Sequence, residues 1–165
     1  MSLGDLHGKP GHLIRRLQQI AVALFMLETE RLTPIQYASL TAIREVPDIE
    51  ASRLSTLVAL DRATLAKVLE RLEAKGWIVR RGSKADKRIK LLRATPKGRA
   101  VLRAAEPGVR RCQRRILAPL GARDRARFVR MLERLVELNN GYSRAPMGEG
   151  GVDGPAKRQR RKSAV

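Results

Sequence analysis

One stretch, residues 61–76, constrains this chain most, because it contains the start, the buried face and the end of one helix. Asp61 is a good N-cap, since its carboxylate can accept hydrogen bonds from the free amides of a first helical turn. Gly76 suits the left-handed position just past a helix end. Four leucines and valines recur between them at the spacing of one helical stripe: Leu65, Val68, Leu69 and Leu72. Small and basic residues lie on the opposite side, so this helix fits either a DNA major groove or an ordinary protein surface.

The preceding residues predict a second, shorter helix. Its apolar positions are Ile49, Leu54, Leu57 and Val58. Only residues 59–61 separate it from the helix that follows. Two helices joined by so short a connection indicate a helix-turn-helix.

The residues that follow predict a β-ribbon. Residues 77–80 and 89–94 have the β-branched and aromatic content of strands, and residues 82–88 form the loop between them. Thr95 and Pro96 then begin another helix, with threonine as the cap and proline at the first helical position. Two helices followed by a hairpin constitute a winged helix-turn-helix.

Three motifs resemble the MarR family of bacterial transcriptional regulators. Residues 86–98 are similar to its wing signature, residues 32–40 to the opening of its second helix, and residues 72–78 to the end of its recognition helix. One departure is Ala94, where the family usually has leucine. The resemblance covers about residues 10–142. It implies a mostly α fold with a small β-hairpin wing, in which the N- and C-terminal helices form a dimerisation region.

The domain organisation follows from these motifs and from apolar patterning. We expect a flexible arm (1–9), a dimerisation helix (10–32), the winged helix-turn-helix (33–98), dimerisation helices (99–142) and a disordered basic tail (143–165). The outer segments carry more apolar residues than a small domain can cover, which suits packing within one chain or against a partner subunit. Pro107 predicts a kink or break near residues 103–106.

The charge favours a polyanionic partner. The net charge is +19, of which the residues from Ser143 onward contribute only +4. Double-stranded DNA is therefore the favoured partner, with an anionic membrane as a weaker second choice. No apolar run approaches a membrane span of about 20 residues, and no signal peptide opens the chain. A single cysteine excludes an internal disulfide, which is consistent with the cytoplasm.

The DNA contacts divide into three groups. Five residues on the outward N-terminal half of the recognition helix lie nearest base edges: Arg62, Ala63, Thr64, Ala66 and Lys67. Four others are placed to position phosphates: Arg53, Ser55, Thr56 and Arg71. In the wing, the resemblance implies that Arg88 enters the minor groove and that Asp86 orients it, while Lys84 and Lys87 serve the backbone.

The family resemblance also implies a small anionic, commonly aromatic, effector. Its candidate residues are cationic or aromatic and lie on the first and second long helices: His12, Arg15, Arg16, Tyr37 and Arg44. Arginine offers a fixed fork to a carboxylate and tyrosine a stacking face. The alternative is that these are solvated cations on a basic protein. Cys112 lies among arginines that could lower its pKa, but a buried structural cysteine is the favoured interpretation.

Enzyme chemistry has little support. The sequence has two histidines, no metal-ligand cluster and no phosphate-binding glycine loop, so we expect no cofactor and no catalysis. We therefore interpret the chain as a homodimeric repressor that binds an inverted-repeat operator and is released by a small ligand. The alternative is a nonspecific architectural DNA-binding protein, which would account for the charge equally well. RNA binding is disfavoured because aromatics make up only 3% of the residues.

Overall fold

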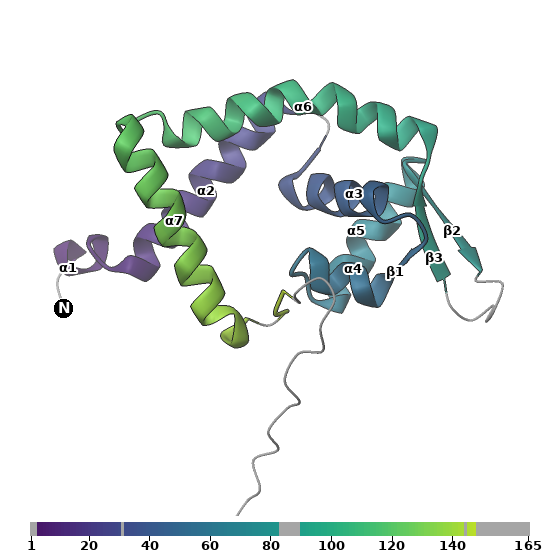
Figure 1. The fold of residues 1–165 in the computed structure, drawn as a ribbon, viewed down its shortest axis with the longest axis horizontal. Coiled ribbons are helices and arrows are strands. Elements are labelled where there is room, and N and C mark those ends of the chain that lie inside the picture. Colours follow the sequence, from purple (N-terminus) through teal and green to yellow (C-terminus); the bar gives the residue numbers. More distant parts are fainter. Residues whose placement is uncertain (1–2, 31, 83–89, 144, 148–165) are drawn as a thin grey trace, which may run out of the picture.

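The computed structural model describes residues 3–30, 32–82, 90–143 and 145–147. Within them the fold is mostly helical with one small sheet (Figure 1). The helices are α1 (Leu3–His7), α2 (Pro10–Glu28), α3 (Pro34–Glu45), α4 (Ala51–Leu57), α5 (Arg62–Ala74), α6 (Pro96–Leu117) and α7 (Ala122–Asn139), followed by the 3₁₀ turn η1 (Asn140–Tyr142). The strands are β1 (Ile49–Glu50), β2 (Ile78–Gly82) and β3 (Lys90–Ala94).

The sheet contains one strand more than the sequence predicted. Its order is β1-β3-β2, and both pairings are antiparallel. Ile49 belongs to β1, opposite Leu92 of β3, so its placement in the short helix was wrong. Strand β1 has only two residues, and they pair with a strand more than 40 positions away, so no local sequence pattern predicts it.

Local signals fix the ends of the helices. Thr33 accepts from the backbone amide of Gln36 while the Gln36 side chain accepts from the Thr33 amide, which is a complete capping box. Thr95 caps α6 by accepting from the Gly98 amide. Gly76, which follows the C-cap residue Lys75 of α5, adopts a φ of 68°, as expected at this position.

The core lies within the winged helix-turn-helix and under α6. The predicted stripe of α5 is buried, with Leu65, Leu69 and Leu72 no more than 2% exposed. These residues join Leu40 and Ile43 of α3 and others from β3 and α6. This packing holds α5 against α3 and leaves its opposite side in solvent.

Two expectations about the outer helices were wrong. Residues 3–7 form the helix α1, where a loose arm was expected. The break expected near residues 103–106 does not occur, and helix α6 continues through Pro107. Gly108, next to it, is buried where α6 crosses the end of α2, and the Glu28 carboxylate there accepts from Arg111 (2.7 Å) and Arg115 (2.9 Å).

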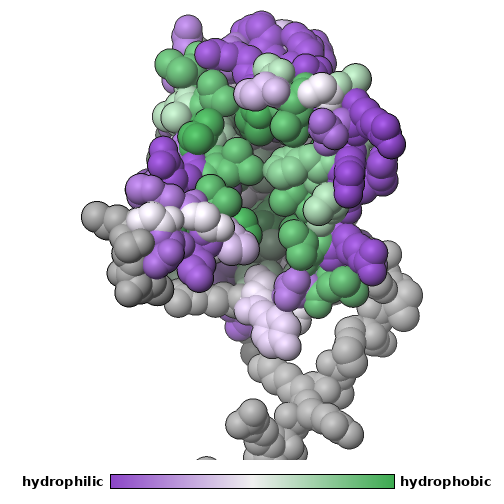
Figure 2. All heavy atoms as spheres, turned by 90° about the vertical axis from the view of Figure 1, so that its left-hand side faces the viewer, coloured by the Kyte–Doolittle hydropathy of each residue, from purple (hydrophilic) through white to green (hydrophobic). Residues whose placement is uncertain are grey.

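An apolar surface covers the end of the molecule formed by α2 and α7. No residue of α7 is buried, and its apolar residues Met131, Leu135 and Val136 are all more than 50% exposed. On α2, Leu13 and Ile14 are exposed to a similar degree. Figure 2 shows hydrophobic residues gathered on this end, with hydrophilic residues around them.

Candidate DNA-binding surface

The start of α5 presents the residues predicted to approach DNA bases. Asp61 caps the helix, accepting from the Thr64 amide at 2.9 Å and from the Thr64 hydroxyl at 2.7 Å. These hydrogen bonds, chiefly those from Thr64, lower the pKa of the Asp61 carboxyl, which keeps the cap ionised. The hydroxyl of Thr64 is therefore engaged within the protein, leaving its methyl group as the part suited to a thymine methyl.

The other residues predicted for base contact are exposed. They are Arg62, Ala63, Ala66 and Lys67. The stripe on the opposite side is held against α3, so these side chains form the free side of the N-terminal half of α5. Small residues between two cations allow the helix backbone to approach a groove closely.

Helix α4 carries three of the predicted phosphate-contacting residues, and the last turn of α5 carries Arg71. Arg53, Thr56 and Arg71 are exposed, as that role requires. Ser55 is half-buried, and its hydroxyl donates to the Leu60 carbonyl oxygen at 2.6 Å. Ala59 adopts a φ of 50° within this turn. Ser55 thus stabilises the turn of the helix-turn-helix, which differs from the phosphate contact predicted for it.

The wing residues Lys84, Asp86, Lys87 and Arg88 lie outside the described residues. The ribbon that leads to them is described: β2 and β3 pair from Ile78 opposite Ala94 to Gly82 opposite Lys90.

The ribbon also exposes cations that the sequence interpretation did not single out. Arg80 pairs with Glu73 at 2.9 Å, and Arg93 binds Asp48, with 3.0 Å between Nε and Oδ1. Arg93 lowers the pKa of the Asp48 carboxyl through these hydrogen bonds. Arg81 and Lys90, at the wing end, are exposed and make no ion pair with the described residues. Their position in the sequence, next to the wing loop, is the signal that could have identified them.

The three ligand candidates on α2 lie together near its N-terminal end. The Nε2 atom of His12 is buried, and it has no hydrogen-bond partner in the described structure. Burial is the main cause that lowers the pKa of His12, and the nearby Arg15, His7 and Arg16 lower it further. Arg15 and Arg16 are exposed.

The two candidates on α3 lie elsewhere. The ring of Tyr37 packs edge-on against Phe25, with centroids 5.8 Å apart, and Phe25 is about 20 Å along α2 from His12. Arg44 pairs with Glu45 (2.8 Å) and Glu106 (3.4 Å). One subunit therefore brings together His12 and its two neighbouring arginines, but it does not join them to Tyr37 or Arg44.

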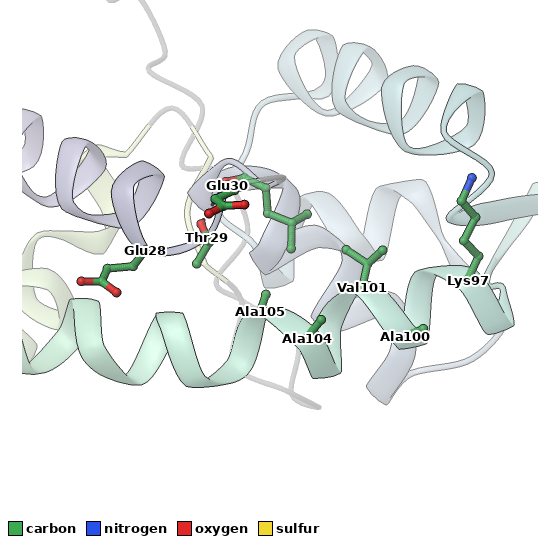
Figure 3. A pocket seen from close by; sticks show the side chains of 9 residues that line it. Glu28, Thr29, Glu30, Lys97, Ala100, Val101, Ala104 and Ala105 are labelled. Carbon is green, nitrogen blue, oxygen red and sulfur yellow. Dashed lines mark hydrogen bonds between the residues drawn. The ribbon is translucent and has the colours of Figure 1, made fainter.

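A hollow lies between the end of α2 and the first half of α6. Its volume is about 460 Å³, and none of the predicted site residues line it. Alanines of α6 form one wall, with Glu30 opposite them, Glu28 at one end and Lys97 farther along α6 (Figure 3).

The described part of the molecule lacks two other kinds of site. In the parts of the chain that the structure describes, no group of three or more histidine, cysteine or carboxylate residues is placed to hold a metal ion. Nor is any helix there long and apolar enough to span a membrane. Cys112 is buried, and this burial raises the pKa of its thiol.

Known proteins are similar to this chain in sequence and in fold. The family model described as "MarR family" matches residues 32–90. A putative transcriptional regulatory protein for the hcr operon of Thauera aromatica is 34% identical over 135 residues, covering 80% of this chain and 81% of the relative.

Solved structures of transcriptional regulators have a similar fold. The PcaV transcriptional regulator of Streptomyces coelicolor, in complex with its natural ligand, has a TM-score of 0.76 and 36% identity, covering 83% of this chain and 98% of that one. The transcriptional repressor CouR, bound to a 23-mer DNA duplex, has a TM-score of 0.75 and 28% identity, covering 82% and 98%. Together with the winged helix-turn-helix described above, these similarities establish that the chain belongs to the MarR family of transcriptional regulators.

Proposed function

We propose that this protein is a transcriptional repressor that binds an inverted-repeat operator as a homodimer. The observation that carries the proposal is the exposed N-terminal half of α5, where Arg62, Ala63, Ala66 and Lys67 form a free face beside a cationic ribbon. A capped helix with small residues between two cations fits the major groove. The similarity to CouR, a repressor bound to a DNA duplex, supports this role.

The apolar surface on α2 and α7 supports a dimer. Single exposed apolar residues are ordinary, but here they are contiguous on two helices, and such patches mark interfaces. A second copy of this surface would cover both apolar faces at once, as twofold symmetry allows. Two recognition helices would then be about 34–36 Å apart, one turn of DNA, which gives the operator its inverted repeat.

The test is selection of the operator followed by a specificity measurement. Duplexes bound by the full-length protein are selected from a random library and sequenced. We expect an inverted repeat, bound at least about 10³-fold more tightly than random duplex at physiological salt. A ratio near one would refute the proposal and favour an architectural DNA-binding protein. A single subunit on each operator, measured by light scattering, would refute the dimer.

The wing arginine provides a residue-level test. We expect Arg88→Ala to weaken operator binding by about 1–3 kcal/mol, as for a groove contact of ordinary strength. Arg81→Ala and Lys90→Ala test the neighbouring ribbon, where a contact with phosphate would weaken all sequences alike and make the salt dependence shallower. Unchanged affinity of the Arg88 variant at fixed salt would remove Arg88 from the interface.

We further propose that a small anionic ligand releases the operator. The supporting geometry is the buried, unpartnered Nε2 of His12 beside Arg15 and Arg16. A ligand carboxylate would give this nitrogen a partner and pair with a guanidinium. Tyr37 and Arg44 can complete the same site only if the partner subunit supplies them, because one subunit holds them apart from His12. PcaV, solved with its natural ligand, is a related protein that binds a small molecule.

Benzoate and its hydroxylated derivatives are suitable probes for this site. We expect one of them to release labelled operator from the wild type, and His12→Ala and Arg16→Ala to require a higher concentration. Lys9→Ala removes an exposed cation near the start of the same helix and is the matched control. Responses identical to the wild type in both site variants would eliminate this location.

A further inference from the structure

A second cationic surface lies outside the winged helix-turn-helix. Residues 51–94 contain twelve lysines and arginines and four acids. Residues 96–139, which form α6 and α7, contain the same numbers, and eleven of their twelve cations are arginines. Half of this excess positive charge therefore belongs to helices that the proposed operator contact does not use.

Some of these arginines serve the fold. Arg111 and Arg115 hold Glu28, and Arg125 donates to the carbonyl oxygens of Leu120 (2.7 Å) and Ala118 (3.2 Å). These contacts fasten α6 to α2 and close the connection between α6 and α7.

Seven others serve no such purpose, and we call them the outer arginines. All seven are exposed: Arg103, Arg110, Arg114, Arg123, Arg127, Arg130 and Arg134. Of these seven, only Arg110 forms an ion pair with a carboxylate of the described residues, that of Glu106 at 3.9 Å. These seven exposed guanidiniums outnumber the four carboxylates of α6 and α7, and the excess positive charge attracts a polyanion.

Helical phase places the outer arginines on one side of each helix. On α6, the buried positions Gly98, Leu102, Gly108 and Cys112 define the inner side. At 3.6 residues per turn, Arg103, Arg110 and Arg114 lie opposite them. On α7, the outer arginines likewise lie opposite the apolar arc, so a partner subunit on that arc leaves them in solvent.

The spacing of the outer arginines suits a phosphate backbone. Arg103 and Arg114 are separated by about 16 Å along α6, and Arg123 and Arg134 by the same length on α7. Each stripe, laid along a duplex axis, matches the axial rise of roughly five phosphates of one strand, about 3.4 Å per phosphate. Arginine pairs with phosphate through two parallel hydrogen bonds. Only one aromatic residue, Phe128, occurs in these helices, which disfavours single strands held by stacking.

The two cationic surfaces face different directions. Helix α3 contacts both α5 and α6 and lies between them. In Figure 1, α6 runs along the upper edge of the molecule, while α4 and α5 lie below α3. A straight duplex on the exposed side of α5 therefore does not reach the outer side of α6.

We propose that the outer arginines bind the phosphate backbone of a second segment of duplex DNA, without sequence preference. The operator occupies α5 and the wing, and the second segment lies against α6 and α7. This inference rests on the proposed function for the first segment only. The second segment is either another molecule or a more distant part of the same one.

The experiment tests both contacts with the full-length protein. The selected operator is fixed to beads and saturated with protein, and a labelled, unrelated duplex of about 30 base pairs is added. We expect the wild-type complex to retain this second duplex. We expect the triple variant R103Q/R110Q/R114Q to bind the operator normally but to retain the second duplex at least tenfold less well. If each arginine neutralises one phosphate, the slope of log affinity against log salt becomes shallower by about 2.7.

Matched variants and probes decide the interpretation. The variant K157Q/R158Q/R160Q removes the same number of cations from the C-terminal residues and should retain the second duplex. The variant R123Q/R127Q/R130Q repeats the test on α7 in case the α6 variant fails to fold. A second segment on the same molecule would appear as tighter binding to a longer operator fragment, a gain that the α6 variant would lose.

Four results would overturn the proposal. In the first, the wild-type complex retains no second duplex and binds a longer operator fragment no more tightly. In the second, the folded α6 variant retains the second duplex as well as the wild type; in the third, only the C-terminal variant loses it. In the fourth, the protein binds poly-glutamate more tightly than duplex DNA. The last result would favour an acidic protein as the partner. Because operator binding is measured first on the same beads, failure of the proposed function is recognised separately.

Discussion

The crossing of α2 and α6 gives a sharp prediction, because it depends on a residue without a side chain. A Cβ atom at position 108 would lie 2.0 Å from the carbonyl oxygen of Glu28 and 3.3 Å from Cγ2 of Thr29. Non-bonded heavy atoms are most stable about 3.5–4.0 Å apart, so Gly108→Ala requires the two helices to separate by roughly 1–2 Å. The obstructing atom belongs to the backbone, and no change of rotamer relieves the contact.

The expected magnitude combines two opposing effects. Overpacking a tight contact costs up to about 3 kcal/mol, and alanine gains about 1 kcal/mol over glycine within a helix. We therefore expect Gly108→Ala to lower the free energy of unfolding by about 2 kcal/mol. Separating the helices also draws Glu28 away from Arg111 and Arg115, which adds to the loss.

Gly11 supplies the matched control. It lies in α2, and a Cβ there meets nothing within 4 Å. Gly11→Ala should leave stability unchanged or raise it by up to about 1 kcal/mol. The assay is urea unfolding followed by far-ultraviolet circular dichroism, at one protein concentration because dimer stability depends on concentration. A Gly108→Ala midpoint at or above that of the wild type would refute the close approach of α2 and α6.

Three further perturbations test the helix-turn-helix and the attachment of α2. Ala59→Gly should raise the free energy of unfolding by up to about 1 kcal/mol, because glycine adopts a φ of 50° without the strain of a Cβ; a lower thermal midpoint would contradict this. Ser55→Ala should destabilise the protein by about 1 kcal/mol through loss of the hydrogen bond to Leu60; weaker DNA binding at unchanged thermal stability would instead make Ser55 a phosphate ligand. The two arginines of α6 lower the pKa of Glu28 below 4.5, so its contribution to stability is complete above that pH and is lost as the pH falls through the native pKa. Glu28→Gln should therefore be less stable than the wild type at neutral pH, with a smaller loss on acidification below pH 4.5; parallel pH profiles would contradict the ion pair.

The sequence predicted the recognition helix well because its determinants are local. Asp61 caps a turn formed by its own neighbours, and Gly76 relieves strain within its own residue, so each signal acts over a few positions. The buried stripe follows from helical periodicity alone. The wing strands were also predicted, since β2 and β3 are neighbours in the chain and pair directly.

Features set by distant contacts were missed. The pairing of Ile49 with Leu92 is invisible to any local pattern, and an apolar residue there suits a helix equally well. The partner of the Ser55 hydroxyl is fixed by the shape of the turn after α4, so the sequence reveals a donor without revealing its acceptor. Likewise, helical spacing alone predicts that His12, Arg15 and Arg16 lie together, but it does not reveal that Arg44 pairs with Glu106 of α6.

The continuity of α6 illustrates how packing overrides a local rule. Proline removes one helical hydrogen bond, that of the carbonyl four residues earlier, here Arg103. Pro107 and Arg103 are both exposed, so this carbonyl lies on the solvent side, where water can satisfy it. On the inner side, Leu102 and Cys112 are buried before and after the proline, and Gly108 lies against the backbone of Glu28. A break at Pro107 would expose these buried residues to water and would gain little, because the unpaired carbonyl is already solvated. The continuous helix is therefore the more stable arrangement.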